Sequence, residues 1–378
     1  HFVFFAFGPS TAGTIYAFGY TLLTGVLLNF VFGVFATRVM IRGAASIKAL
    51  RNPWLYGAVK PGKEVKEKKP IDFVGLRKRF LTISTCLMAA IILCAAVFGV
   101  RLDTEFTGGA MITLSYQGEI STSEVQKTAS TALENNGLTL QTGENVATGE
   151  QTLKISMPGN ETVTTDQVEN LLTSLNEQYP DNAFAQLSLS NVSAAMGTKF
   201  LQKSLVAVVF SLLLILLYIG FRFKKIGGLT GGLMAVLALL NDLIVVFGTF
   251  VLLRTPLDGN FIAAMLTILG YSINDTVVVY DRIRENRALM GKKTPFELVN
   301  HSVNQSARRT IITTVTTVMA LGVMCVVSKL YGLDSIFTFA FPLMMGMLSG
   351  VYTSLCVSTS AWVLWNDRKS KKAETKKA

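Results

Sequence analysis

The stretch Gly270-Tyr-Ser-Ile-Asn-Asp-Thr-Val-Val-Val-Tyr-Asp-Arg-Ile-Arg-Glu285 continues an apolar run that begins near Phe261, and it places the carboxyl group of Asp275 inside that run. A run of this length and polarity predicts a helix that crosses a membrane. An aspartate at the middle of such a helix costs roughly 2.5–3.5 kcal/mol on insertion scales, so it normally faces a partner or a water-filled path. Asp275 is therefore the first candidate for the passage of a proton or another ion.

The composition extends this prediction to the whole chain. Of the 378 residues, 50% are hydrophobic and only 16% are charged, with a mean hydropathy of +0.45. The sequence therefore predicts a multi-pass α-helical membrane protein. The apolar runs long enough to span a membrane cover residues 15–40, 80–99, 202–220, 228–252, 261–280, 309–328 and 337–365.

The start of the chain has its own pattern. The apolar residues from Phe2 to Phe7 predict the tail of one more span. The chain opens on His1 rather than methionine and shows no basic segment followed by a cleavage site, so we expect no signal peptide. We interpret the sequence as a piece of a longer polypeptide.

Charge asymmetry predicts the orientation of the spans. Residues 38–79 hold twelve basic and three acidic residues, which places this loop on the cytoplasmic side. Residues 101–198 hold three basic and twelve acidic residues, and the alternation of spans places them outside. The same alternation places the lysine-rich C-terminus in the cytoplasm. The net charge of +11 then reflects basic loops that set topology and contact anionic lipid, so we expect no nucleic-acid partner.

Cysteine and histidine usage argues against metal and redox chemistry. The only histidines are His1 and His301, and the sequence contains neither a CxxC pair nor a Cys/His cluster with ligand spacing. No glycine-rich phosphate loop of the Walker type is present either. We therefore expect no metal, no cofactor and no bond-cleaving enzyme activity. The four cysteines all fall in predicted spans: Cys86, Cys94, Cys325 and Cys356.

The acidic segment 101–198 predicts one compact α+β domain. Alternating or apolar strand patterns cover residues 110–117, 139–142, 152–157 and 185–192, and helical spacing covers residues 122–133 and 165–176. This order, βαββαβ, is that of a ferredoxin-like fold. The fold alone indicates only a small binding or docking domain.

A second helix start lies on the cytoplasmic side. Thr294-Pro-Phe-Glu297 has the spacing of a capping box with proline at the first helical position. We expect a short surface helix from here to Gln305, lying along the inner leaflet.

Three motifs resemble the SecD/SecF family, accessory subunits of the bacterial protein-export translocase within the resistance–nodulation–division (RND) superfamily. Phe106-Thr-Gly-Gly109 resembles the family's extracytoplasmic motif, Gly270 to Asn286 resembles the fourth SecF span, and Ser306-Ala-Arg-Arg-Thr310 resembles the start of the fifth. Residues 71–366 resemble a whole SecF unit. Residues 1–57 resemble the C-terminal end of SecD, as in the fused SecDF arrangement.

The sequence departs from the family pattern at a few positions. Glu105 stands where the extracytoplasmic motif more often has Asp, and Tyr280 stands where Phe is usual. Asn241-Asp242 resembles a His-Asp pair without the histidine. This last departure weakens the case for Asp242 as part of a two-residue proton relay.

The resemblance implies a division of the chain into six segments. The predicted order is a transmembrane end of a SecD-like half (1–40), a basic cytoplasmic linker (41–78), the first SecF-like span (79–100), the extracytoplasmic domain (101–198), a five-helix transmembrane bundle (199–366) and a basic cytoplasmic tail (367–378).

The resemblance also implies roles for individual residues. Asp275 would carry the coupling ion, with Arg309 on the next helix as its charge partner and Asp242 as a second acidic candidate. Thr313 and Thr316, with their neighbours, would offer hydroxyls to a file of water molecules. Phe106, Gly108 and Gly109 form the extracytoplasmic motif. Hydrogen-bonded helix packing remains the alternative explanation for the membrane residues, and the coupling ion remains open between H⁺ and Na⁺.

The function implied is that of an accessory subunit of the Sec translocase in the bacterial cytoplasmic membrane, using the proton or sodium motive force to promote preprotein translocation. The implied partners are the SecD half, the SecYEG channel, YajC or YidC, unfolded preprotein and the bilayer. Two alternatives stay open. One is a passive scaffold that steadies the channel. The other is an RND small-molecule exporter, which the single small outer domain disfavours.

Overall fold

The computed structural model describes residues 13–52, 70–135, 137–144, 149–159, 162–290 and 293–375. The chain forms two compact units, His1–Ile71 and Asp72–Ala378. The first unit contains a continuous helical rod made of α2 (Gly13–Leu28), the π-helical η2 (Asn29–Ala36) and α3 (Thr37–Ser46), followed by the 3-10 turn η3 (Lys48–Leu50). Its apolar side chains are exposed, as in a helix that faces lipid. The predicted span tail at Phe2–Phe7 lies outside the described residues.

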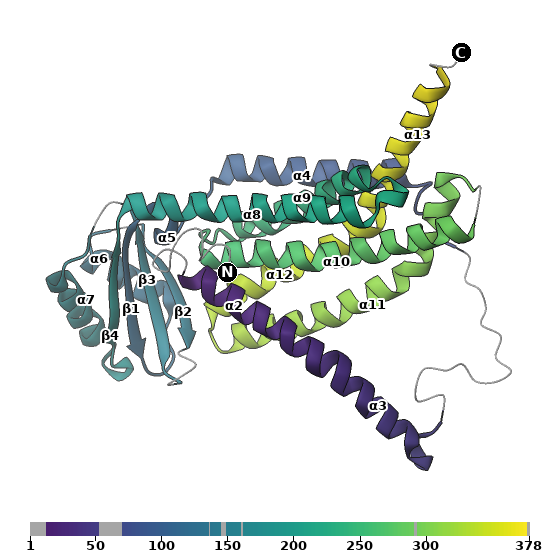
Figure 1. Cartoon of the computed structure of the whole chain (residues 1–378). Helices are drawn as coiled ribbons and strands as arrows, with labels where there is room; N and C mark the ends of the chain where they lie inside the picture. Colours follow the sequence, from purple (N-terminus) through teal and green to yellow (C-terminus); the bar gives the residue numbers. More distant parts are fainter. Residues whose placement is uncertain are drawn as a thin grey trace. The chain divides into compact units, whose positions relative to one another are not determined.

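The second unit is built around a bundle of long helices (Figure 1). Together with the rod of the first unit, seven helices in the described part of the chain are long and apolar enough to cross a membrane, which confirms the predicted fold class. Helices α9, α10 and α12 are largely buried, whereas α4, α8 and α11 expose apolar side chains on one side. The bundle helices are α4 (Arg77–Phe98), α8 (Ala194–Arg222), α9 (Gly228–Leu253), α10 (Gly259–Leu289), α11 (Pro295–Leu330) and α12 (Asp334–Tyr352), the last continued by the π-helical η7 (Thr353–Ser358) and α13 (Thr359–Thr375).

A four-stranded antiparallel sheet with two helices on one face lies at one end of the bundle (Figure 1). The strand order is β2-β3-β1-β4, which is the ferredoxin-like topology predicted from the sequence. We call the segment from α5 to β4 the sheet domain. Its elements are α5 (Thr104–Thr107), β1 (Gly109–Tyr116), α6 (Thr122–Ala132), β2 (Thr139–Glu144), β3 (Gln151–Pro158), α7 (Thr165–Gln178), the 3-10 turn η5 (Pro180–Asn182) and β4 (Ala185–Val192).

Alternation along the strands fixes the register of the sheet. Ile112 of β1 lies opposite Ile155 of β3 and Leu189 of β4. Ile112 and Ile155 are fully buried against Leu171 of α7 and other apolar side chains of the two helices. Because a shift by one residue would turn these side chains to the other face, the apolar pattern specifies this pairing.

Helix α11 differs from the sequence prediction. Thr294 caps it by accepting a hydrogen bond from the Glu297 backbone N–H at 3.3 Å, and Pro295 occupies the first helical position. The helix does not end near Gln305, however, but continues unbroken to Leu330. The expected separate surface helix is therefore wrong. Neither glycine nor proline interrupts residues 296–321, and Ser306 is buried within the bundle, so nothing ends the helix there.

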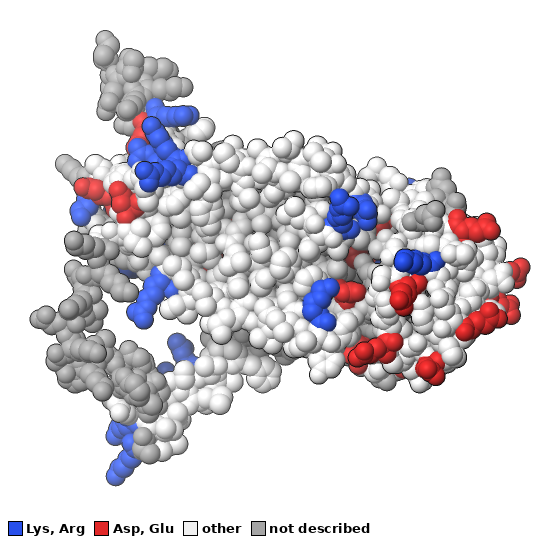
Figure 2. All heavy atoms as spheres, turned by 180° about the vertical axis from the view of Figure 1, so that it is seen from behind, with Lys and Arg blue, Asp and Glu red and all other residues white. Residues whose placement is uncertain are grey.

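Charged side chains are distributed unevenly over the second unit. Figure 2 shows acidic side chains over the sheet domain and basic side chains gathered at the opposite end of the bundle. That opposite end contains the 3-10 turn η6 (Lys224–Ile226) before α9 and the connection between α10 and α11.

Candidate functional site

Asp275 lines a cavity of about 270 Å³ between three helices. Its carboxyl group is half-buried and forms no hydrogen bond or ion pair with any residue that the structure describes. The lining is polar at a depth where a membrane helix is normally apolar. It comprises Tyr271, Ser272, Asn274 and Asp275 of α10, Thr313, Thr314, Thr316 and Thr317 of α11, and Met347 and Gly350 of α12.

The threonine hydroxyls of α11 lie in the same cavity as Asp275. Thr313 Oγ1 donates to the Arg309 carbonyl at 2.9 Å, and Thr316 Oγ1 donates to the Thr313 carbonyl at 2.8 Å. Because these hydroxyl hydrogens point back to their own helix, the oxygen lone pairs remain able to accept hydrogen bonds from the cavity. The structure thus brings Thr313 and Thr316 together with Asp275.

Arg309 lies apart from this cavity, one turn before Thr313. Its side chain is exposed and lines a second cavity of about 390 Å³ that also includes Arg222 and Asp281. Within the described ranges, no nitrogen of Arg309 lies within 4.0 Å of a carboxylate oxygen. Arg309 and Asp275 thus line different cavities and form no ion pair, so their pairing remains a prediction.

Asp242 of α9 is fully buried, and hydroxyl groups surround its carboxylate. Ser272 Oγ donates to Oδ2 at 2.6 Å, Ser349 Oγ donates to Oδ1 at 2.6 Å, and Thr353 Oγ1 lies 2.9 Å from both oxygens. Such hydrogen bonds offset part of the large cost of burying a carboxylate. The preceding Asn241 accepts a hydrogen bond from Ser84 Oγ at 2.9 Å.

Ser272 connects the two membrane aspartates. Its hydroxyl binds Asp242, and the residue also lines the cavity of Asp275. Polar contacts continue along α10: Thr276 Oγ1 lies 2.9 Å from Ser354 Oγ, and the Tyr280 hydroxyl lies 2.7 Å from Ser358 Oγ. A row of buried polar contacts therefore follows the inner side of α10. Tyr280 contributes its hydroxyl to this row, which a phenylalanine could not do.

The hydroxyl residues of the last span are functional candidates that were missed from the sequence. The segment from Ser349 to Ser360 is rich in serine and threonine although it lies in an apolar span. This composition could have indicated a polar site within the span. In the structure, Thr353 to Ser358 form the π-helical turn η7, and all six residues are buried. π-Helical turns within α-helices often occur at functional sites.

The motif Phe106-Thr-Gly-Gly109 forms a tightly packed corner between β1 and α8. Phe106 is buried and stacks on Phe200 of α8 with ring centroids 5.6 Å apart. Gly108 has φ +83°, and a Cβ there would lie 2.5 Å from the Ala194 backbone. Gly109 has φ +126°, and a Cβ there would overlap the Met157 carbonyl oxygen. Both positions therefore require glycine, for conformation as well as for space.

Beside this corner, three carboxyl groups surround one lysine. Lys154 Nζ of β3 lies 3.4 Å from Asp103 and 3.7 Å from Glu105. Glu105 Oε2 accepts a hydrogen bond from the Gly259 backbone N–H at 2.8 Å, at the first residue of α10. The third carboxyl group belongs to Asp258, which caps α10 by accepting from the backbone N–H groups of residues 260 and 261. We call these four residues the charged junction.

Burial and charge set the titration of the charged junction. Burial, together with the nearby Glu105 and Asp103 carboxylates, raises the pKa of Asp258 to about 7. Burial by itself would lower the pKa of Lys154. The facing carboxylates of Asp103, Glu105 and Asp258 outweigh this effect, so the pKa of the lysine is raised. The charged junction was missed from the sequence because Lys154 and Asp258 are about one hundred residues apart.

A second contact joins the sheet domain to the bundle. Thr142 of β2 is hydrogen-bonded to the Gly332 carbonyl, and its Oγ1 lies 3.2 Å from Asp334 Oδ2 at the start of α12. Ser335 Oγ donates to the Thr142 carbonyl at 3.3 Å. The sheet domain thus contacts the first residues of both α10 and α12, and both helices line the cavity of Asp275.

Comparison with known proteins identifies the family. The model of the family described as "Protein export membrane protein SecD/SecF, C-terminal" matches residues 171–368, which is more than half of the chain. The chain belongs to the SecD/SecF family. Sequence similarity to a curated relative supports the same assignment. The SecF protein translocase subunit of Alicyclobacillus acidocaldarius is 31% identical to this chain, over 81% of this chain and 96% of that protein.

Fused members of the SecD/SecF family match over nearly the whole chain. The SecDF protein translocase subunit of Bacillus subtilis is 28% identical over 98% of this chain but only 49% of its own length. The crystal structure of SecDF from Thermus thermophilus, a translocon-associated membrane protein, superimposes with a TM-score of 0.72 at 26% identity, over 94% of this chain and 47% of that one. This chain therefore spans about half the length of the SecDF proteins that it matches.

Proposed function

We propose that this SecD/SecF family member is the SecF part of an accessory subunit of the Sec translocase, and that it uses the movement of protons, or of Na⁺, to promote preprotein translocation. Family membership supports the role in protein export. The observation that carries the ion-driven part is the unpaired, half-buried carboxyl group of Asp275 in a polar cavity at membrane depth.

In the proposed mechanism, Asp275 binds and releases the coupling ion. The hydroxyls of Thr313 and Thr316 accept hydrogen bonds from the water molecules that deliver it, and Arg309 compensates the carboxylate charge. A membrane potential supplies about 2.3 kcal/mol per elementary charge per 100 mV. This energy shifts an equilibrium between two conformations by more than tenfold for each charge that crosses.

The contacts of the sheet domain support a route by which this energy reaches the outside. Glu105 is bonded to the start of α10, and Thr142 is bonded to the start of α12. A change in the charge of Asp275 that shifts α10 relative to α12 would tilt the sheet domain, because both contacts lie on its side of the bundle. The tilting domain would hold or pull the emerging polypeptide.

The proposed orientation places the sheet domain outside the bacterial cytoplasmic membrane and the basic end of the bundle, with the C-terminus, in the cytoplasm. The polar residues Tyr271, Asn274 and Thr313 are exposed along the cavity of Asp275. We propose that the SecD half covers this face, since lipid would not. The SecYEG channel, YajC or YidC and unfolded preprotein are the further proposed partners. No covalent chemistry is part of this function.

A passive scaffold for the translocase channel is the second candidate function. The observation that favours it is the complete hydrogen bonding of Asp242, whose carboxylate receives three hydroxyl groups and has a purely structural explanation.

Export of a preprotein in cells distinguishes the two functions. The variant Asp275→Asn would be introduced into the intact protein together with its SecD half, and the control Asp281→Asn would change an exposed aspartate that is paired with Arg222 and Arg284. The motor function predicts export defects only for Asp275→Asn, at unchanged protein level. Equal export by both variants would exclude the motor function and favour the scaffold function.

A further inference from the structure

The charged junction has an excess of negative charge that its surroundings do not relieve. It contains three carboxyl groups and one lysine, and Asp103 and Asp258 are only 1% and 3% exposed. In the described part of the chain, Lys154 is the only cation within 4.0 Å of these carboxyl groups, and it pairs with Asp103 and Glu105 but not with Asp258. With all four side chains ionised, the junction would hold two uncompensated negative charges largely away from water, which is costly.

One carboxyl oxygen of the junction provides an independent observation. Asp103 Oδ2 faces Lys154 Nζ at 3.4 Å, but Asp103 Oδ1 is buried and accepts no hydrogen bond from any residue that the structure describes. Buried polar atoms in native proteins almost always have a partner. The cost of leaving one unpaired is larger for a charged group than for a neutral one. The unpaired oxygen therefore also favours a further positive charge within the junction.

The charges that act on Asp258 come from the other three residues of the junction. Arg101 and Arg254 belong to the neighbouring segments, but both line a separate small cavity, where the Arg254 guanidinium lies over the Phe98 ring. Lys199 of α8 is exposed. None of these three cations forms an ion pair with a junction carboxyl group within the ranges that the structure covers. The excess negative charge is therefore a property of the junction itself.

The same residues attach the sheet domain to the start of α10. The Asp103 N–H donates to the Leu257 carbonyl at 2.9 Å, and the Leu257 N–H donates to the Arg101 carbonyl at 2.9 Å. Glu105 Oε2 accepts the Gly259 N–H at 2.8 Å. These three hydrogen bonds join the segment before β1 to the segment before α10, directly beside the buried carboxyl groups. Repulsion among the carboxylates therefore acts on this attachment.

We propose that the charged junction binds one proton, and that loss of this proton weakens the attachment of the sheet domain to α10. The proton comes from solution and adds to a carboxylate oxygen, and no other covalent bond forms or breaks. Asp258 is the carboxyl group that holds it, because it lies farthest from compensation by Lys154. The pKa of Asp258, raised to about 7, supports this choice. The site is separate from the ion route at Asp275 and does not depend on it.

Infrared absorption of protonated carboxyl groups tests the proton site in the purified intact protein with its SecD half. Difference spectra between the parent and Asp258→Asn isolate the contribution of this one side chain. We expect a carboxyl band that disappears with a midpoint near pH 7. The control Asp181→Asn changes an exposed aspartate of the sheet domain and should keep the band. Asp275→Asn should also keep it, so this result is independent of the proposed ion route.

Two further variants shift the titration in opposite directions if the junction acts electrostatically. Glu105→Gln removes a facing negative charge and should lower the midpoint, whereas Lys154→Gln removes the facing cation and should raise it, each by about one pH unit. A junction with a purely structural role would not produce opposite shifts. These variants also keep the proposal testable if Asp258→Asn does not fold.

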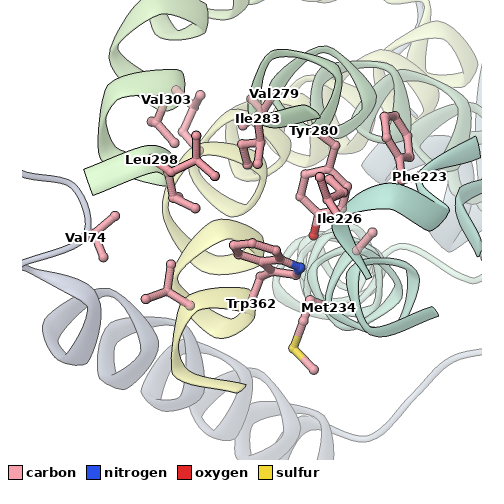
Figure 3. Close-up of a cluster of buried hydrophobic side chains, with 14 of the residues drawn as sticks. Val74, Phe223, Ile226, Met234, Val279, Tyr280, Ile283, Leu298, Val303 and Trp362 are labelled. Carbon is pink, nitrogen blue, oxygen red and sulfur yellow. The ribbon is translucent and has the colours of Figure 1, made fainter. Parts of the chain in front are cut away.

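Hydrogen exchange measures the attachment of the sheet domain. Protection of the Gly259 amide, which donates to Glu105, should fall by up to about tenfold per pH unit between about pH 4 and pH 7, after correction for intrinsic rates. An internal reference lies at the other end of the bundle, where Figure 3 shows Ile283 and Val303 in a cluster of apolar and aromatic side chains. Protection of these two amides should stay constant.

The proposal has three outcomes that would overturn it. The first is the absence of a titrating carboxyl band that Asp258→Asn removes. The second is an unchanged midpoint in both Glu105→Gln and Lys154→Gln. The third is protection of Gly259 that changes with pH no more than that of Val303.

Discussion

The Ser272 hydroxyl donates a hydrogen bond to Asp242 Oδ2 at 2.6 Å, and the same residue lines the cavity that contains Asp275. One side chain of α10 therefore separates the buried carboxylate of α9 from the carboxyl group that is open to the cavity. We propose that Ser272 couples the charges of the two aspartates, because hydrogen bonds in a low-dielectric interior polarise one another.

The hydroxyls around Asp242 depend on its carboxylate. Asp242→Leu would leave the hydroxyls of Ser272 and Ser349 without their acceptor in the protein interior, at roughly 1–3 kcal/mol for each unpaired group. We expect a clear fall in the thermal unfolding midpoint of the purified protein. Asp242→Asn retains an acceptor oxygen and should unfold much closer to wild type. Equal midpoints for Asp242→Leu and wild type would show that the hydrogen bonds do not stabilise the bundle.

Gly108, in the corner between β1 and α8, should not tolerate a side chain. Gly108→Ala places a methyl group 2.5 Å from the Ala194 backbone at a φ of +83°, so we expect β1 and α8 to move apart. Hydrogen exchange of the Phe106 and Met196 amides should become faster. The control is Gly220→Ala within α8, where a Cβ would meet no atom within 4 Å. Unchanged exchange in Gly108→Ala would contradict the tight packing of this corner.

Lys154 holds the carboxyl groups of the charged junction together. Asp103 is only 1% exposed, so Lys154→Met leaves a buried carboxylate without its cation, which typically costs about 3–5 kcal/mol. We expect faster hydrogen exchange where the sheet domain meets α10, at the Asp103 and Gly259 amides. Lys127→Met, which changes an exposed lysine of α6, serves as the control. Similar exchange in both variants would argue against a stabilising ion pair.

The charged junction should loosen as the pH rises. Because the folded protein raises the pKa of Asp258 from 3.8 to about 7, the folded state retains a proton that the unfolded chain loses first. The contribution of Asp258 to stability is therefore complete below about pH 4, decreases by on the order of 1.4 kcal/mol per pH unit up to about pH 7, and is lost above it.

Hydrogen exchange at the start of α10 measures this pH dependence. The amides of Asn260 and Phe261 donate to Asp258 and should lose protection, after correction for intrinsic rates, between about pH 4 and pH 7. Asp258→Asn keeps an acceptor for the helix cap but does not titrate, so its protection should stay constant. The facing Glu105, Asp103 and Lys154 remain unchanged in this variant. An equal pH slope in both proteins would exclude Asp258 as the titrating group.

Most of the fold could be predicted from the sequence because it depends on local patterns. Apolar runs located the membrane helices, and alternation located strands such as Ala185–Val192. The wrong prediction that a helix ends at Gln305 also came from local patterns. The sequence showed the helix start at Thr294, but it did not show that Ser306 is buried in the bundle and that the helix continues past it. Packing of one helix against another decides such points, and a single sequence does not contain it.

The candidate site could be predicted only in part. Asp275 and the threonines of α11 were found because polar residues within an apolar run are conspicuous. The bond from Ser272 to Asp242 joins two helices, so it does not follow from spacing along the chain. The charged junction required the distant Lys154 and Asp258 to meet. Each of these features arises from tertiary structure.

The ion flux through reconstituted vesicles tests the central role of Asp275 most directly. The intact protein with its SecD half would be placed in vesicles under a potassium diffusion potential, with a pH-sensitive dye for protons and, in a parallel series, a sodium-sensitive dye. We predict flux of one ion that falls at least about tenfold in Asp275→Asn, since a neutral amide cannot bind and release a cation in the cavity, and that is unchanged in Asp281→Asn. Flux of that same ion through Asp275→Asn at the wild-type rate would contradict the proposed role of Asp275.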